Sequence, residues 1–309
     1  MKKTIFETEV QGPSLSSECA TVKILCDRAR HPRMEWFASS GESLWTTVDL
    51  DLFKRLEFFS ERSTGLRKNA DSSLATFEHL TPVLLMYPQS YFEIRALSKE
   101  LPILDGSAYP WYEAVRKIAG LPQDLVFYDA PIRERFDWGY GFMEVSPADS
   151  LEIEYSISHG SYADDAYVEI YEAEDLVKLF PARTFIFEDD FKKARAEGLL
   201  AGVDGSCGLL LCEENGKTSV VAGEKFRMPN EPVMHKILDL IGDIALPVPF
   251  LPRLRIRIHN GGHLAHRKLL ERILEYAYRY TPQVDQAGRS LRLCGDSSDL
   301  AAPLSVPVY

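Results

Sequence analysis

The sequence predicts an α+β fold made of two domains. The chain has 309 residues, a length that suggests two domains or one large domain. Strand-like and helix-like patterns are mixed along both halves of the chain. A strand pattern also restarts near Leu121–Asp124, directly after a helical stretch that Gly120 would cap. We therefore expect a first α+β domain at residues 1–122 and a second α+β domain at residues 123–309.

Extended and helical stretches alternate in the first domain. The alternation of apolar and polar residues in ATVKILCD and SYFEIRAL predicts strands at residues 20–27 and 90–97. Helices are expected at residues 50–63, at residues 72–88, and after a turn at Asp105-Gly106. Pro88 would end the second of these helices, which places Thr76 to Leu80 in its first turns.

The second domain repeats this mixture of elements. SLEIEYSIS and RLRIRIHN alternate and predict strands at residues 150–158 and 253–260. Helices are expected at residues 189–200, 230–243 and 263–281. Residues 207–223 predict a hairpin that turns at Asn215-Gly216. From about residue 283 the chain is rich in Ser, Asp, Pro and Ala, so we expect a loosely held tail.

Composition limits the classes of partner. The formal net charge of −11 argues against non-specific binding to nucleic acid or to an anionic membrane surface. The five cysteines include no Cys-x-x-Cys pair, so we expect reduced thiols rather than disulfides or a thiolate zinc site. The N-terminus does not read as a signal peptide, and no apolar stretch is long enough to span a bilayer. We expect a cytoplasmic monomer with no nucleic-acid partner and no integral membrane segment.

A polar stripe runs along one predicted helix of the second domain. In NEPVMHKILDLIGD, residues 230–243, His235, Asp239 and Asp243 fall at i, i+4 and i+8 and share one helix face. The stripe is either a solvated edge or a row of ligands that faces a cleft. An imidazole and a carboxylate at i and i+4 suit two ligands of one zinc ion. A catalytic zinc ion also needs a third protein ligand and an open position for water.

His79, in the stretch ATFEHL, offers that third ligand. Glu78 precedes it, and a carboxylate there could take a proton from zinc-bound water instead of binding the metal. His263 follows two glycines at the start of the last predicted helix, and Asp243 could orient and charge a histidine. Each pattern alone is weak, because a lone histidine on an apolar helix is usually a satisfied core residue.

Five motifs together match one known family in order and spacing. They are TFEHL, LPILDGSA, ARTF, NEPVMHKILDLIGD and GGHLAHRKLL, and they cover the chain from about Thr76 to about Ile273. In these motifs the chain resembles the UDP-3-O-acyl-N-acetylglucosamine deacetylases, the zinc enzymes that commit bacteria to lipid A synthesis. The resemblance implies deacetylation of an acylated nucleotide sugar.

The resemblance also implies a site and an architecture. The family's zinc ligands fall on His79, His235 and Asp239, and its general base falls on Glu78. The family's catalytic histidine falls on His263, and that histidine's partner falls on Asp243. Its oxyanion-binding threonine falls on Thr184, and a lysine near the substrate's polar groups falls on Lys236. The family fold implies that each domain is a layered β-α-α-β sandwich, with the active site between the two domains.

The chain departs from the family pattern near its N-terminus. The family's Gly-x-Gly-Leu/Ile-His-Ser/Thr-Gly stretch is replaced by QGPSLSSE, which puts Ser16 in place of the histidine and Glu18 in place of the last glycine. Met234 also replaces an arginine, and His266 replaces an asparagine. Two alternatives therefore stay open: a divergent paralogue that deacetylates another acyl-sugar, and a metal-binding homologue without turnover. Retention of Glu78, Thr184 and His263 argues against the second.

Three arginines alternate along the strand at residues 253–260. Arg253, Arg255 and Arg257 share one strand face. We interpret this face as solvated, although the strand leads into the His263 loop and a contact with a diphosphate is the alternative.

Overall fold

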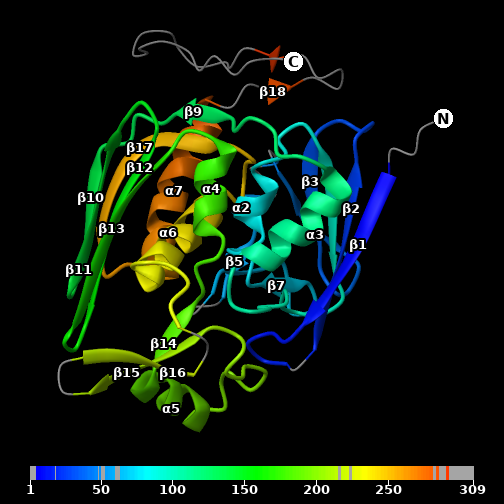
Figure 1. The fold of residues 1–309 in the computed structure, drawn as a ribbon. Helices are drawn as coiled ribbons and strands as arrows, with labels where there is room; N and C mark the ends of the chain where they lie inside the picture. Colours follow the sequence, from blue (N-terminus) through cyan, green and yellow to red (C-terminus); the bar gives the residue numbers. More distant parts are fainter. Residues whose placement is uncertain are drawn as a thin grey trace.

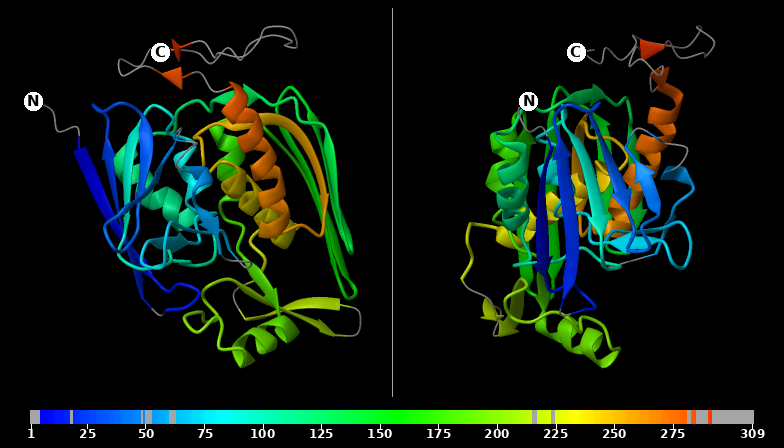
Figure 2. Two further views of the ribbon diagram at one scale, coloured as in Figure 1. Left: turned by 180° about the vertical axis from the view of Figure 1, so that it is seen from behind. Right: turned by 90° about the vertical axis from the view of Figure 1, so that its right-hand side faces the viewer.

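The protein has a mixed α+β fold in which helices lie between two large sheets (Figures 1 and 2). The structure is a computed structural model that describes residues 5–17, 19–47, 49, 53–59, 63–214, 217–222, 225–280, 283–284 and 290–291. In the described residues no helix is both long enough and apolar enough to cross a bilayer.

The first large sheet contains strands from the first third of the chain. Its order is β1-β2-β8-β3-β4, with β3 and β8 parallel and the other neighbours antiparallel. The strands are β1 (Ile5–Gly12), β2 (Ala20–Asp27), β8 (Tyr91–Ala96), β3 (Arg33–Phe37) and β4 (Ser43–Thr46). Helix α3 (Tyr109–Ala119) packs against β1 and β2. The predicted strands at 20–27 and 90–97 are confirmed. Gly120 follows α3 with φ of 87°, as expected for a residue that ends a helix.

Two helices predicted in this region are wrong. In the described part of residues 50–63, only Phe53 and Lys54 are helical, and β5 (Glu57–Phe58) pairs with β6 (Gly65–Arg67), which pairs with β7 (Ser73–Ala75). The helix expected at 72–88 shrinks to α2 (Thr81–Leu84). Thr76 breaks it with a left-handed φ of 68°. Nearly the whole stretch is buried, so apolar residues occur at almost every position. Their spacing therefore does not distinguish a helix from another buried conformation.

The second large sheet has the order β10-β11-β17-β12-β13, and β9 also pairs with β17. Its strands are β9 (Phe127–Asp129), β10 (Glu134–Trp138), β11 (Gly141–Pro147), β12 (Leu151–His159), β13 (Tyr162–Ile170) and β17 (Leu251–His259). The helices α4 (Ala173–Leu179), α6 (Glu231–Ile244) and α7 (His263–Tyr280) lie on its inner face (Figure 1). Strands β12 and β17 are parallel, which leaves their ends close to the start of α7. The predictions for β12, β17, α6 and α7 are confirmed.

A small unit between α4 and α6 projects from the end of the molecule (Figure 2). It consists of β14 (Phe185–Phe187), α5 (Glu188–Ala196), β15 (Leu209–Glu214) and β16 (Lys217–Ala222). Strands β15 and β16 form the predicted hairpin, whose turn at 215–216 lies outside the described residues. Of the predicted tail, only the paired strands β18 (Gln283–Val284) and β19 (Ser290–Leu291) are described.

Side chains from both halves of the chain form one continuous hydrophobic core. In its first part Trp36 and Trp45 stack and Phe77 meets both rings edge-on, with ring centroids 4.9–5.2 Å apart. The indole nitrogen of Trp45 donates to the carbonyl oxygen of Leu246, at 3.3 Å, just beyond α6. Helix α2 also packs against α6. This contact brings the turn before α2 next to the polar stripe of α6.

Candidate metal and catalytic site

The polar stripe of α6 is buried. The exposed fractions of His235, Asp239 and Asp243 are 0%, 1% and 2%. The apolar residues beside the stripe pack into the core, and Pro232 occupies the first turn, where its missing N–H costs no helical hydrogen bond. The solvated-edge interpretation of the stripe is therefore wrong, and the stripe faces the turn before α2.

His79, His235 and Asp239 meet across the two halves of the chain; we call them the His–His–Asp group. One potential ligand atom from each lies within 4.8 Å of the others. Asp239 Oδ1 lies 3.1 Å from His235 Nε2 and 3.6 Å from His79 Nε2. His235 Nδ1 donates to the carbonyl oxygen of Ala182 at 3.1 Å, which fixes the tautomer and leaves Nε2 free to act as a ligand.

Three atoms of this group are buried without a hydrogen-bond partner in the described structure: His79 Nδ1, His235 Nε2 and Asp239 Oδ1. A buried polar atom normally has a partner, because an unsatisfied one costs about 1–3 kcal/mol. Two of these atoms, His235 Nε2 and Asp239 Oδ1, face each other beside His79 Nε2, and a nitrogen–nitrogen–oxygen donor set is one that zinc commonly takes. The residues present therefore fit a zinc ion.

Lys236 lies beside this group. Its Nζ is 2.9 Å from Asp239 Oδ2 and lies over the ring of Phe185 at 5.7 Å. Burial alone would raise the pKa of Asp239, but the neighbouring His235 and Lys236 hold it well below its ordinary value. Burial would lower the pKa of Lys236, but the Asp239 carboxylate outweighs burial and raises it. Both groups are therefore ionised at neutral pH.

Glu78 and His263 face each other next to the His–His–Asp group. Glu78 Oε1 lies 3.9 Å from His263 Nε2, and Glu78 Oε2 accepts a hydrogen bond from the backbone N–H of Thr64 at 3.2 Å. Burial raises the pKa of Glu78 to about 7. Burial would lower the pKa of His263, but the adjacent Asp243 carboxylate raises it to about 9. The site thus pairs a carboxylate that can take up a proton near neutral pH with a histidine that keeps its proton.

Asp243 accepts hydrogen bonds from two histidines and a threonine. Its Oδ2 lies 2.8 Å from His263 Nδ1 and 2.7 Å from His266 Nδ1. Its Oδ1 accepts from the hydroxyl of Thr64. The sequence patterns did not single out Thr64, and they marked His266 only as a departure from the family. Thr64 carries no local pattern, since its contact with Asp243 spans 179 positions.

Thr184 is placed by its backbone. Its N–H donates to the carbonyl oxygen of Gly106 at 2.7 Å, and its carbonyl oxygen accepts from Leu209 at 2.8 Å. Within the described residues, the side-chain hydrogen bonds of His235 and Asp239 go to Ala182 and Lys236, not to the Thr184 hydroxyl. Asp105 forms the expected turn by accepting from Ser107, and it also pairs with Arg227 at 2.7 Å.

Comparisons of the sequence with known proteins point to one family. A family model described as UDP-3-O-acyl N-acetylglycosamine deacetylase matches residues 36–275. The chain belongs to this family. The UDP-3-O-acyl-N-acetylglucosamine deacetylase of Synechocystis sp. is 27% identical over 86% of this chain and 95% of its own length. Those of Thermosynechococcus vestitus and Aquifex aeolicus are 30% and 31% identical, over 66% and 65% of this chain and 70% and 69% of their own lengths.

The resemblance inferred from the motifs is thus confirmed, and the deacetylase family is one of zinc-dependent enzymes. Of the residues that depart from the family pattern near the N-terminus, Ser16 is exposed and its N–H donates to Glu100 Oε2 at 2.9 Å. Glu18 lies outside the described residues. Met234 is partly buried and packs against the core.

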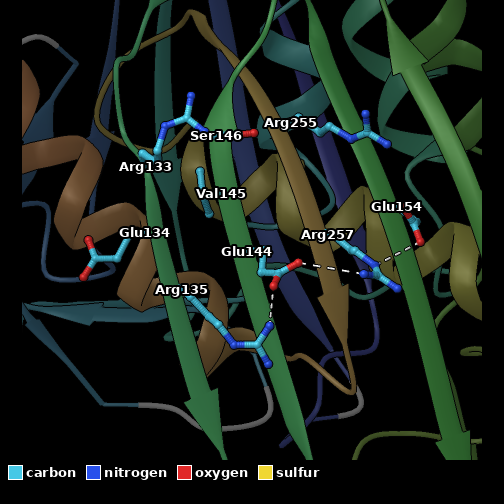
Figure 3. A pocket seen from close by; sticks show the side chains of 9 residues that line it. All are labelled: Arg133, Glu134, Arg135, Glu144, Val145, Ser146, Glu154, Arg255 and Arg257. Carbon is cyan, nitrogen blue, oxygen red and sulfur yellow. Dashed lines mark hydrogen bonds and ion pairs between the residues drawn. The ribbon is translucent and has the colours of Figure 1, made fainter.

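The arginines of β17 do not face the site. Arg255 and Arg257 line an open groove on the outer face of the second sheet, with the helices behind it (Figure 3). Arg257 lies 3.2 Å from Glu154 and 3.8 Å from Glu144, while Arg255 lies 3.8 Å from Glu152. Both arginine side chains are 56% exposed. The solvated-face interpretation is confirmed, and carboxylates offset the positive charge.

Gly242 allows α6 to approach the backbone of Glu78. A Cβ atom at this position would lie 2.2 Å from the carbonyl oxygen of Glu78. In an open helix, Gly→Ala gains roughly 1 kcal/mol, whereas overpacking a core costs roughly 1–3 kcal/mol. Because the obstacle is backbone, we expect Gly242→Ala to lower the free energy of unfolding by roughly 1–2 kcal/mol net and to reduce turnover by shifting Glu78.

Urea denaturation measures the first effect, and acetate release measures the second. Gly139→Ala is the matched control, because a Cβ there meets nothing within 4 Å. An unchanged or raised stability in Gly242→Ala would show that the Glu78 turn can move aside without cost.

Proposed function

We propose that the protein is a zinc-dependent deacetylase that hydrolyses the N-acetyl group of a UDP-3-O-acyl-N-acetylglucosamine-type substrate in cytoplasmic lipid A biosynthesis. The observation that carries this proposal is the buried His–His–Asp group, with its orphaned His235 Nε2 and Asp239 Oδ1, beside the facing pair of Glu78 and His263. A metal-binding protein without turnover would need the His–His–Asp group but not the pair of Glu78 and His263.

In this proposal His79, His235 and Asp239 hold the zinc ion. When bound, zinc supplies Lewis acidity, which polarises the acetamide carbonyl and makes a neighbouring water molecule more acidic. Glu78 and His263 lie beside the His–His–Asp group: His263 Nε2 is 3.9 Å from Glu78 Oε1 and 3.9 Å from Asp239 Oδ2.

The chain's own residues then move the protons. Glu78 accepts a proton from the attacking water, and its raised pKa of about 7 suits a group that must later release that proton. His263, protonated through its contact with Asp243, stabilises the developing oxyanion or protonates the leaving amine at Nε2. Thr184 contributes to oxyanion binding, and Lys236 holds polar groups of the substrate.

The proposal includes the domain division. Residues 1–122 and 123–309 would be two layered β-α-α-β domains of a monomer, with the site between them. Its support is the origin of the site residues: Glu78 and His79 precede the boundary, whereas His235, Asp239 and His263 follow it.

We expect one zinc ion per chain in protein purified without added metal. His79→Ala removes one of three ligands and should lower the zinc content well below one equivalent. Elemental analysis of both proteins measures this, and His31→Ala, outside the His–His–Asp group, is the control. Less than a third of an equivalent in the unmutated protein, unchanged by His79→Ala, would contradict the assignment.

Ser16 in place of the family's histidine favours a second candidate, a paralogue that acts on a different acyl-sugar. An acetate-release assay on acylated and unacylated UDP-sugars distinguishes the two. Turnover confined to UDP-3-O-acyl-N-acetylglucosamine supports the first proposal, and turnover confined to another sugar supports the second.

A further inference from the structure

The carboxylate of Asp243 is held by three donors from different segments. It is 2% exposed. The Thr64 hydroxyl reaches Oδ1, while His263 and His266 both donate to Oδ2. An ionised carboxylate accepts about four hydrogen bonds. These three donors therefore fix its position and rotation, and only one of them, His263, has a part in the proposed reaction.

Thr64 connects the two sides of the site. Its backbone N–H donates to Glu78 Oε2 at 3.2 Å, and its side-chain hydroxyl donates to Asp243. The same hydroxyl oxygen lies 3.4 Å from His263 Nδ1. Its carbonyl oxygen accepts from the N–H of Thr76 at 2.9 Å, which anchors Thr64 to the turn that carries Glu78. One residue thus contacts both the candidate base and the partner of the candidate acid.

His266 continues the hydrogen-bonded chain behind Asp243. It is fully buried, and its Nδ1 lies 2.7 Å from Asp243 Oδ2. Its Nε2 lies 3.3 Å from the hydroxyl of Tyr155, which is also fully buried. Donation from Nδ1 leaves Nε2 as the acceptor for that hydroxyl, so Tyr155 and Asp243 together fix the tautomer and orientation of His266.

We propose that Thr64 and His266 are positioning residues of the deacetylation, which hold the Asp243 carboxylate against His263 Nδ1 and so aim His263 Nε2 at the face shared with Glu78. This inference rests on the proposed function, because it gives His263 and Glu78 parts in hydrolysis. If the donor of Thr64 or of His266 is removed, one oxygen of Asp243 loses a buried hydrogen-bond partner, and the carboxylate rotates toward a different donor. The 2.8 Å contact with His263 then lengthens.

The test compares Thr64→Val with Thr64→Ser in the zinc-loaded full chain. Valine keeps the shape and the backbone N–H but removes the hydroxyl, while serine keeps the hydroxyl. We expect Thr64→Val to lower kcat by roughly tenfold to a hundredfold, because the lost hydrogen bond is to a charged group. The KM and zinc content should stay near those of the unmutated protein, and Thr64→Ser should retain most of kcat.

A parallel pair tests His266. Leucine removes the donor, whereas asparagine places an amide N–H where His266 Nδ1 stood. We expect His266→Leu to lose kcat as Thr64→Val does, and His266→Asn to retain most of it. The far-downfield proton resonance of His263 Nδ1–H gives a readout that needs no turnover. It should shift upfield or broaden in Thr64→Val and His266→Leu only.

Three results would overturn the proposal: an unchanged kcat and resonance in Thr64→Val and His266→Leu, an equal loss in the serine and asparagine variants, or a loss explained by missing zinc. Failure of the proposed function is distinguishable from these. In that case the unmutated protein releases no acetate, while the resonance still reports whether Thr64 and His266 position His263.

Discussion

Glu78→Gln is expected to lower kcat by roughly 10²–10⁴-fold, the usual contribution of a general base, while the zinc content stays at one equivalent. Glutamine preserves the shape of the side chain and keeps an oxygen that can accept from the Thr64 N–H. It cannot take a proton from water. The side chain is 3% exposed, so no solvent group takes over its position easily.

Kinetics of acetate release and elemental analysis of the same samples measure both halves of this expectation. Glu197→Gln, an exposed glutamate at the end of α5, is the matched control and should leave both quantities unchanged. Loss of zinc in Glu78→Gln would make Glu78 a ligand instead of a base. Full turnover with zinc in place would assign proton transfer to another group.

Local patterns were enough to predict α6, β17 and α7. Each has an apolar face with a regular period that is visible in the sequence: in α6, Ile237 and Ile241 recur at i and i+4, on the side of the helix opposite His235. The assignment of His79 came from motif resemblance, not from its own pattern. The helix expected around His79 failed because that stretch is buried on all sides and Thr76 takes a left-handed conformation.

The surroundings of the site could not be predicted in the same way. Thr64 directly follows residues 50–63, which were predicted as a helix but contain β5, so its place in space was unknown. In the sequence, His266 was only a residue of α7 that replaces the family's asparagine. The position of Tyr155 on β12 shows what its second ring nitrogen contacts. Partners so far apart along the chain are fixed by tertiary packing, which has no signature in a short stretch of sequence.

Removing one partner from the buried ion pair of Arg183 and Glu231 is expected to have the largest effect on stability. Arg183 Nε lies 2.7 Å from Glu231 Oε1, and the two side chains are 3% and 0% exposed. The backbone N–H groups of Arg183 and Arg227 also donate to the carboxylate, at 3.1 and 2.7 Å. Arg183→Met leaves this carboxylate buried without its cation, which costs roughly 3–5 kcal/mol.

Urea denaturation of Arg183→Met measures the loss. Arg253→Met is the control, because Arg253 pairs with the exposed Asp129 and should change stability by less than about 1 kcal/mol. A loss below about 1 kcal/mol in Arg183→Met would show that the carboxylate finds another partner or a proton.

The double variant Arg183→Met/Glu231→Leu separates the pair's own contribution from the penalty of an unpaired charge. An apolar pair of similar volume can be neutral or even stabilising relative to a buried ion pair. We therefore expect the double variant to be more stable than Arg183→Met alone. Glu231 begins α6, and Arg183 precedes Thr184, so the pair also ties the helix of His235 and Asp239 to the strand beside it. A double variant that regains stability but not turnover would show that the ion pair is kept for the placement of Thr184, not for the free energy of folding.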